Sequence, residues 1–89
     1  MNWDYRLEAG ALKDLRDLGP SARGEIVAYL DRRLRGAVDP RRFGKPLRGD
    51  RKGTWRYRVR DYRVLCRLED RVMIVTVIAA GHRSTVYDG

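Results

Sequence analysis

The stretch WRYRVRDYRVLCR, residues 55–67, alternates aromatic or aliphatic residues with arginine and decides the fold of the chain. Successive side chains of a β-strand point to opposite faces, so this alternation is typical of strands with one apolar face. Asp61 interrupts the pattern and predicts a tight reversal. The stretch therefore predicts two antiparallel strands, over residues 53–60 and 62–69.

The arginines of this stretch fall on the face opposite to the apolar side chains. A guanidinium group is costly to bury without a partner, so we expect this face to lie in water. The five arginines expected on this open basic face are Arg56, Arg58, Arg60, Arg63 and Arg67. The other face of the sheet is expected to pack on the core.

Upstream of this stretch, the pattern predicts one strand followed by two helices. Residues 2–8 alternate like a strand, and residues 9–18 place apolar side chains at helical spacing. Gly19 suits the end of that helix and Pro20 suits the first turn of a second helix, which we expect over about residues 21–35. The apolar residues at helical spacing in the first helix are Ala11, Leu12, Leu15 and Leu18. In the second helix the expected buried stripe consists of Ile26, Leu30 and Leu34, with Val27 beside them.

Residues 37–50 show no clear period, contain two prolines and two glycines, and predict a long loop. Residues 72–80 form an apolar run that we place inside the sheet. The predicted order is β-α-α-β-β-β, an α+β fold in a single domain over residues 1–89. A helical hairpin is expected on one face of a mostly antiparallel sheet.

The charge of the chain is concentrated in one segment. The 89 residues carry a net charge of +8, and residues 41–67 contain 11 basic and two acidic side chains. The net charge of this segment is thus +9, whereas that of the remaining residues is −1. A concentrated positive field attracts polyanions, and nucleic acid is the leading candidate. The alternative is ordinary solvated charge on strands.

The sequence gives little support for a membrane protein, a secreted protein or a cysteine-dependent enzyme. No apolar run approaches the roughly 18 residues of a membrane span, and the beginning of the chain does not resemble a signal peptide. The single cysteine, Cys66, is interpreted as a buried strand residue rather than a nucleophile. These features predict a cytoplasmic protein.

Three chemically capable side chains follow the last predicted strand in the stretch AGHRSTVYDG: His82, Arg83 and Tyr87. We expect this segment to emerge beside the basic face. Tyr87 could instead be a hydrophobic anchor, and His82 could be a surface turn residue.

The chain resembles the RelE/ParE toxin family of bacterial toxin–antitoxin systems. The resemblance extends over essentially the whole chain and rests on KPLRGDRKGTWRYRVRDYRVLCRLED and VIAAGHRSTVY, with a weaker contribution from ALKDLRDLGP. It implies the RelE-like microbial ribonuclease fold. It also implies one of two activities: ribosome-dependent cleavage of mRNA in the ribosomal A site, as in the RelE branch, or inhibition of DNA gyrase, as in the ParE branch.

The RelE branch uses basic strand residues together with a C-terminal arginine and tyrosine. The matching residues are Arg56, Arg58, Arg63, Arg83 and Tyr87, and this full set favours the RelE branch. Ribonuclease members often have lysine at the first two positions. Arginine effectively cannot lose a proton, so a conventional general base is not expected there.

The resemblance implies RNA cleavage without a metal or cofactor. Arg63 and Arg83 are expected to stabilise the phosphate, while Tyr87 and His82 are candidates for proton transfer, substrate orientation or a structural role. Seven further residues are expected to bind RNA phosphates: Arg56, Arg58, Arg60, Lys45, Arg48, Lys52 and Arg67.

The resemblance also implies partners. These are the 70S ribosome with its mRNA and an acidic, RelB-like antitoxin encoded by a neighbouring gene. The toxin and antitoxin would form a hetero-oligomer that binds DNA through the antitoxin. No membrane partner is implied. The alternatives are a ParE-like toxin directed at gyrase and a non-catalytic protein that binds nucleic acid or an antitoxin.

Overall fold

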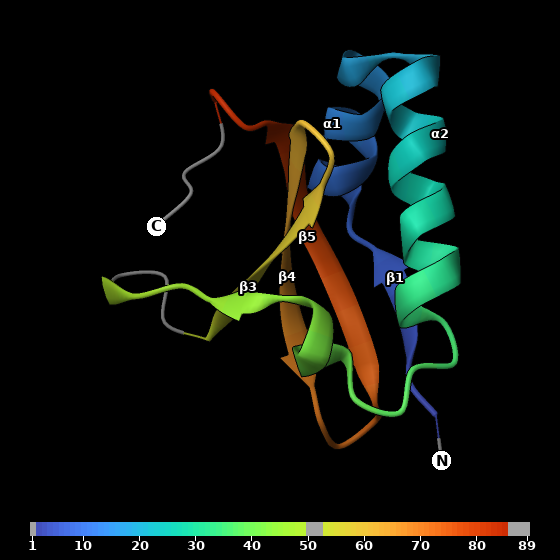
Figure 1. The fold of residues 1–89 in the computed structure, drawn as a ribbon, viewed down its shortest axis with the longest axis vertical. Helices are drawn as coiled ribbons and strands as arrows, with labels where there is room; N and C mark the ends of the chain where they lie inside the picture. The colour runs from blue at the N-terminus through green and yellow to red at the C-terminus, as the bar shows by residue number, and fades with distance from the viewer. Residues whose placement is uncertain (1, 50–52, 86–89) are drawn as a thin grey trace.

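The computed structural model describes residues 2–49 and 53–85. Its centre is a five-stranded sheet with the order β1-β5-β4-β3-β2, and both helices lie on one side of it (Figure 1). The strands are β1 (Asp4–Leu7), β2 (Lys45–Pro46), β3 (Thr54–Val59), β4 (Tyr62–Glu69) and β5 (Ile74–His82). β1 pairs in parallel with β5, and the other neighbours are antiparallel. The predicted fold class and the interior position of the last long strand are confirmed.

The two helices are α1 (Ala9–Leu18) and α2 (Pro20–Tyr29). Gly19 separates them with a φ of 98°, a conformation that glycine adopts without steric cost, and Pro20 opens α2. The sequence predicted one α-helix through about residue 35, but a π-helical segment, η1 (Leu30–Leu34), follows α2. The amide of Arg35 donates to the carbonyl of Leu30, which marks the wider turn.

The core lies between the helices and the sheet. Ile26, Leu30 and Leu34 are fully buried, as predicted. Leu12 of α1 lies at helical spacing but is 50% exposed. Only Ala11 and Leu15 of α1 are fully enclosed, so the helix presents a narrower apolar stripe to β5 than its sequence indicates.

The predicted loop over residues 37–50 contains regular structure, which corrects that expectation. It includes a 3₁₀-helix, η2 (Pro40–Phe43), and the short strand β2. The Asp39 side chain accepts a hydrogen bond from the Arg41 amide, and the buried hydroxyl of Tyr57 donates to the Pro40 carbonyl at 2.9 Å. Capping and tertiary contacts thus order a segment that has no hydrophobic period.

A register shift bends the sheet near its middle. Leu65 pairs with Ala79, but the next residue, Cys66, pairs with Val77, so Ile78 is an extra residue in β5. Cys66 is fully buried, as predicted, and burial raises the pKa of its thiol. Within the described residues, every helix is too short or too polar to cross a membrane.

Candidate functional site

Basic residues from three strands meet on the face of the sheet that lies away from the helices. Tyr57 and Val59 of β3 point into the core, so Arg56 and Arg58 belong to the opposite face. The strand register adds two further cations, because Lys45 is opposite Arg56, and Arg63 is opposite Arg58. We call these four residues the basic face: Lys45, Arg56, Arg58 and Arg63.

Arg63 lies within the basic face but is not exposed. Its side chain is only 3% accessible, which corrects the expectation that all five strand arginines lie in water. Its Nη1 donates to the carbonyl oxygens of Arg60 and Tyr62, at 3.1 and 2.9 Å. These backbone acceptors compensate for part of the lost solvation and fix the guanidinium beside the turn between β3 and β4.

Arg83 approaches the same turn from the end of β5. Its amide donates to the carbonyl of Asp61 at 2.7 Å, and its Nε lies 3.9 Å from the Asp61 carboxylate. The Arg83 side chain is 60% exposed and is available to an external anion. The two arginines predicted to stabilise phosphate therefore converge on one turn, Arg63 from within and Arg83 from the surface.

Arg60 and Arg67, which the sequence also places on the open face of the sheet, are directed elsewhere. Arg60 follows the end of β3, has a left-handed φ of 54° and lies 3.6 Å from Glu25 of α2. Arg67 donates to Glu8 at 2.8 Å. Carboxylates that are distant in sequence pair with both residues, so neither contributes an uncompensated charge to the basic face.

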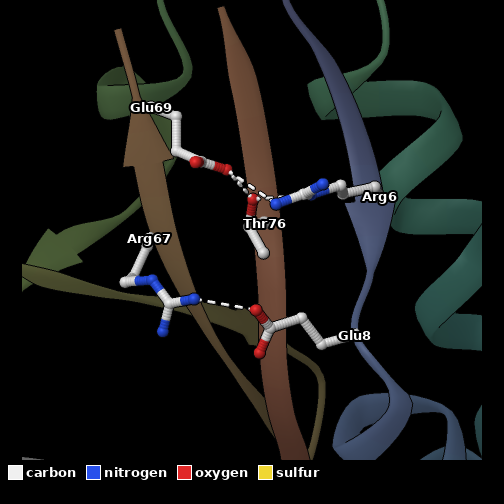
Figure 2. Close-up of polar contacts among 5 residues, drawn as sticks. All are labelled: Arg6, Glu8, Arg67, Glu69 and Thr76. Atoms are coloured by element: carbon white, nitrogen blue, oxygen red, sulfur yellow. Dashed lines mark hydrogen bonds and ion pairs between the residues drawn. The ribbon is translucent and has the colours of Figure 1, made fainter.

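A polar network covers the part of the sheet around Arg67, as Figure 2 shows. Arg6 of β1 reaches across β5, where its Nε donates to the Thr76 hydroxyl at 3.2 Å and its Nη2 lies 3.4 Å from Glu69. Thr76 also donates to Glu69. This region carries balanced charge, which restricts the basic face to the β2–β3 side and to the end of the sheet near Arg63.

His82 lies apart from the arginines. Val64 and Ala80 pair across β4 and β5 and both point into the core, and Tyr62 and His82 form the next pair on that same face. The imidazole contacts the Tyr62 ring edge-on, with 6.1 Å between centroids, and its Nδ1 lies 2.9 Å from the Ser84 hydroxyl. The segment that follows β5 was expected to emerge beside the basic face. Arg83 of this segment reaches the turn there, whereas strand alternation directs His82 to the helix side.

Three residues of the predicted site remain: Arg48, Lys52 and Tyr87. Arg48 is exposed and follows Leu47, whose amide donates to the Thr54 carbonyl at 2.9 Å. Lys52 and Tyr87 lie outside the described residues.

A hollow of about 160 Å³ opens beside the basic face and contains two residues that the sequence analysis did not single out, Arg42 and Phe43. Gly44, Lys45, Arg56 and Arg58 complete its lining. The signal in the sequence was an aromatic residue among cations, RRFGK, within a segment that we had interpreted as loop. Within residues 2–49 and 53–85, no three histidine, cysteine or acidic side chains gather to hold a metal ion.

The fold and the basic face define a class of protein, small α+β domains with two helices packed on a mixed sheet and cations on its open face. Residues 5–87 match the sequence model of the family described as the ParE toxin of the type II toxin–antitoxin system parDE. Toxin RelG of Mycobacterium tuberculosis is 32% identical over 87 residues, which cover 98% of each chain. The chain therefore belongs to the RelE/ParE toxin family of type II toxin–antitoxin systems, in its RelE-like branch.

Solved structures agree with this assignment. The chain matches the toxin–antitoxin complex RelBE2 of M. tuberculosis with a TM-score of 0.84 and 31% identity, over 93% of this chain and all of that one. A doubly substituted RelE toxin of Escherichia coli in the free state matches with a TM-score of 0.70 and 27% identity, over 92% of this chain and 84% of that one. The predicted family and branch are thus confirmed.

Proposed function

We propose that this toxin is a ribosome-dependent endoribonuclease that cleaves mRNA in the ribosomal A site. The observation that carries the proposal is the convergence of Arg58, Arg63 and Arg83 at one end of the sheet. Arg58 and Arg63 face each other on adjacent strands, and Arg83 is tied to the turn that Arg63 holds. Planar guanidinium groups in fixed positions suit the oxygens of a phosphodiester.

The reaction needs no metal. The 2′-hydroxyl of one nucleotide loses its proton and attacks the adjacent phosphorus, the bond from phosphorus to the 5′-oxygen breaks, and that oxygen gains a proton. The products are a 2′,3′-cyclic phosphate and a 5′-hydroxyl end. In this proposal, Arg83 contacts the pentacoordinate phosphate and Arg63 adds positive charge from beneath it. One oriented donor of this kind contributes about 10²–10³ in rate.

The arginines stabilise charge but do not exchange protons, because the guanidinium group stays protonated. Tyr87 is the proposed partner for the 2′-hydroxyl, either orienting it or accepting its proton. The ribosome supplies much of the remaining catalysis by holding the mRNA in a reactive geometry. Lys45, Arg56 and Arg58 bind the neighbouring phosphates.

An acidic, RelB-like antitoxin is the proposed inhibitor. M. tuberculosis RelBE2 and E. coli RelBE were both solved as toxin–antitoxin complexes. In this chain, the charge of the basic face complements an acidic partner segment that becomes ordered on binding. We expect such a partner to cover part of the basic face and to add bulk that excludes the toxin from the A site.

Primer extension on translated mRNA after induction tests the proposed activity. We expect cuts within codons in the presence of ribosomes, and none when the antitoxin is co-expressed. A second candidate, inhibition of DNA gyrase, is favoured by the match to the family described as ParE. DNA breaks and filamentation with intact mRNA would establish that activity and overturn the proposed cleavage.

A further inference from the structure

Some cations of the described residues pair with carboxylates and others do not. In the part of the chain that the structure describes, six arginines form ion pairs with carboxylates: Arg6, Arg35, Arg41, Arg60, Arg67 and Arg83. Within residues 2–49 and 53–85, no ion pair forms at Arg32, Arg33, Arg42, Lys45 or Arg58. Three of these five residues, Arg32, Arg33 and Arg42, were not among the predicted site residues.

Three shallow hollows join these uncompensated cations into one surface. The first hollow, about 310 Å³, lies between α2 and the end of β3. The second, about 220 Å³, lies beside η1. The third is the hollow of about 160 Å³ next to the basic face. Arg32 and Arg58 each line the first hollow, and Arg42 with Phe43 lines both the second and the third. We call this region the Phe43 surface: Arg32, Arg33, Arg42, Phe43, Lys45 and Arg58.

Phe43 orients two of the cations. The guanidinium carbon of Arg33 lies 5.4 Å from the centroid of the Phe43 ring, and that of Arg42 lies 5.9 Å from it. Interaction with a ring uses the flat face of a guanidinium group and leaves its in-plane N–H groups to bind other acceptors. The phenyl ring itself packs against the core, so both side chains rest on a fixed support.

We propose that the Phe43 surface binds the sugar-phosphate backbone of RNA, at a position separate from the bond that is cut. This inference rests on the proposed function, because it continues the RNA path from Lys45 and Arg58 of the basic face toward the end of α2. Several oriented cations around an aromatic support suit a run of phosphates. The RNA is either messenger or ribosomal, and both present the same phosphodiester chemistry.

The test compares Arg33→Gln/Arg42→Gln with Arg16→Gln/Arg23→Gln, which removes the same charge from exposed arginines outside the three hollows. Affinity is measured for mRNA-free ribosomes and for a short single-stranded RNA over a range of salt concentrations. Loss of two phosphate contacts lowers the slope of log affinity against log salt by about 1.4 for single strands and about 1.8 for duplex-like RNA. Circular dichroism and thermal unfolding establish that both variants fold.

Weaker binding to ribosomes alone supports the proposal and identifies ribosomal RNA, and weaker binding to the short RNA alone supports it and identifies messenger RNA. Weaker binding to both ligands supports it for RNA phosphates of either source. Equal affinity of the two variants for both ligands would overturn it. So would RNA binding that is retained while affinity for the antitoxin is lost, because the surface would then belong to the protein partner. If wild-type toxin binds RNA but does not cleave mRNA, the proposed function fails while the binding comparison still decides the role of this surface.

Discussion

Arg63 donates a hydrogen bond from Nη1 to the carbonyl oxygen of Arg60, and this contact holds the turn that connects β3 to β4. Arg60 has a left-handed φ of 54°, which non-glycine residues adopt at a steric cost, so a hydrogen bond to its carbonyl helps to stabilise the turn. Asp61, which binds the Arg83 amide, belongs to the same turn. Arg63 thus positions the segment against which Arg83 rests.

For Arg63→Ala, we expect a loss of both stability and cleavage. The substitution leaves two carbonyl oxygens without this donor, which costs about 1–3 kcal/mol in the free energy of unfolding. Denaturant unfolding measures the first effect and primer extension the second. Arg63→Lys keeps the charge, and with it part of the activity. Full activity in Arg63→Ala would exclude any positioning role for the guanidinium.

Arg83→Ala should separate activity from stability. Its side chain is exposed and its contact with Asp61 is long, so the free energy of unfolding should change by less than about 1 kcal/mol. Cleavage on ribosomes should fall about 10²–10³-fold if the guanidinium contacts the phosphate. Arg71→Ala, at an exposed turn position, is the matched control and should cleave like the wild type. Unchanged cleavage in Arg83→Ala would remove this residue from the site.

His82→Ala should alter cleavage by no more than a few-fold. Its ring lies on the helix face of the sheet beside Tyr62, away from the basic face. The dependence of the single-turnover rate on pH is the informative measurement. The profile of the variant should match that of the wild type, whereas loss of a transition that the wild type shows would identify His82 as an acid or base.

Gly44→Ala should destabilise the protein by about 1–3 kcal/mol. A Cβ atom at this position would lie 2.8 Å from Cε1 of Tyr57 and 2.9 Å from the carbonyl oxygen of Arg56. The backbone at residue 44 must therefore move away from β3, or β3 must move away from it. Gly24→Ala in α2 is the control, because nothing lies within 4 Å of its Cβ position. That variant should be about 0.5–1 kcal/mol more stable than the wild type. Equal melting temperatures for the two variants would refute the steric explanation.

Asp70→Asn should change how the stability of the folded protein depends on pH. Arg41 donates two hydrogen bonds to Asp70, at 3.0 and 2.9 Å, and this contact holds the pKa of the carboxyl below its usual value. Because the pKa of this carboxyl is lower in the folded than in the unfolded protein, its charged form stabilises the fold at pH values above the unfolded-state pKa, which is about 3.9. This contribution is lost as the pH falls through the folded-state pKa.

The variant should therefore lose more thermal stability near neutral pH than at about pH 2. The Tyr5 amide and Arg35 also lower the pKa of Asp4. Asp4 therefore still makes the stability of this variant depend on pH. Thermal unfolding across the acid range measures the difference. An equal loss at both ends of the range would mean that the contact acts independently of the carboxylate charge.

Much of the fold could be predicted from sequence because its signals are local. The alternation in residues 55–67 defines two strands, and Gly19 with Pro20 separates the two helices through backbone preferences alone. The β2 strand and η2 were missed because their order depends on distant partners. Arg41, for example, contacts the rings of Trp3 and Trp55 and binds Asp70.

The sequence by itself determined which residues of β3 lie on the face away from the core, because the two-residue period of a strand is intrinsic to the backbone. Only the tertiary structure decided which of the predicted basic residues act together. Glu25 and Glu8 compensate Arg60 and Arg67, and two carbonyls at the turn bind the buried Arg63. Electrostatic energy depends on distance in space, and folding brings Glu8 and Arg67 together although they are 59 residues apart in the chain.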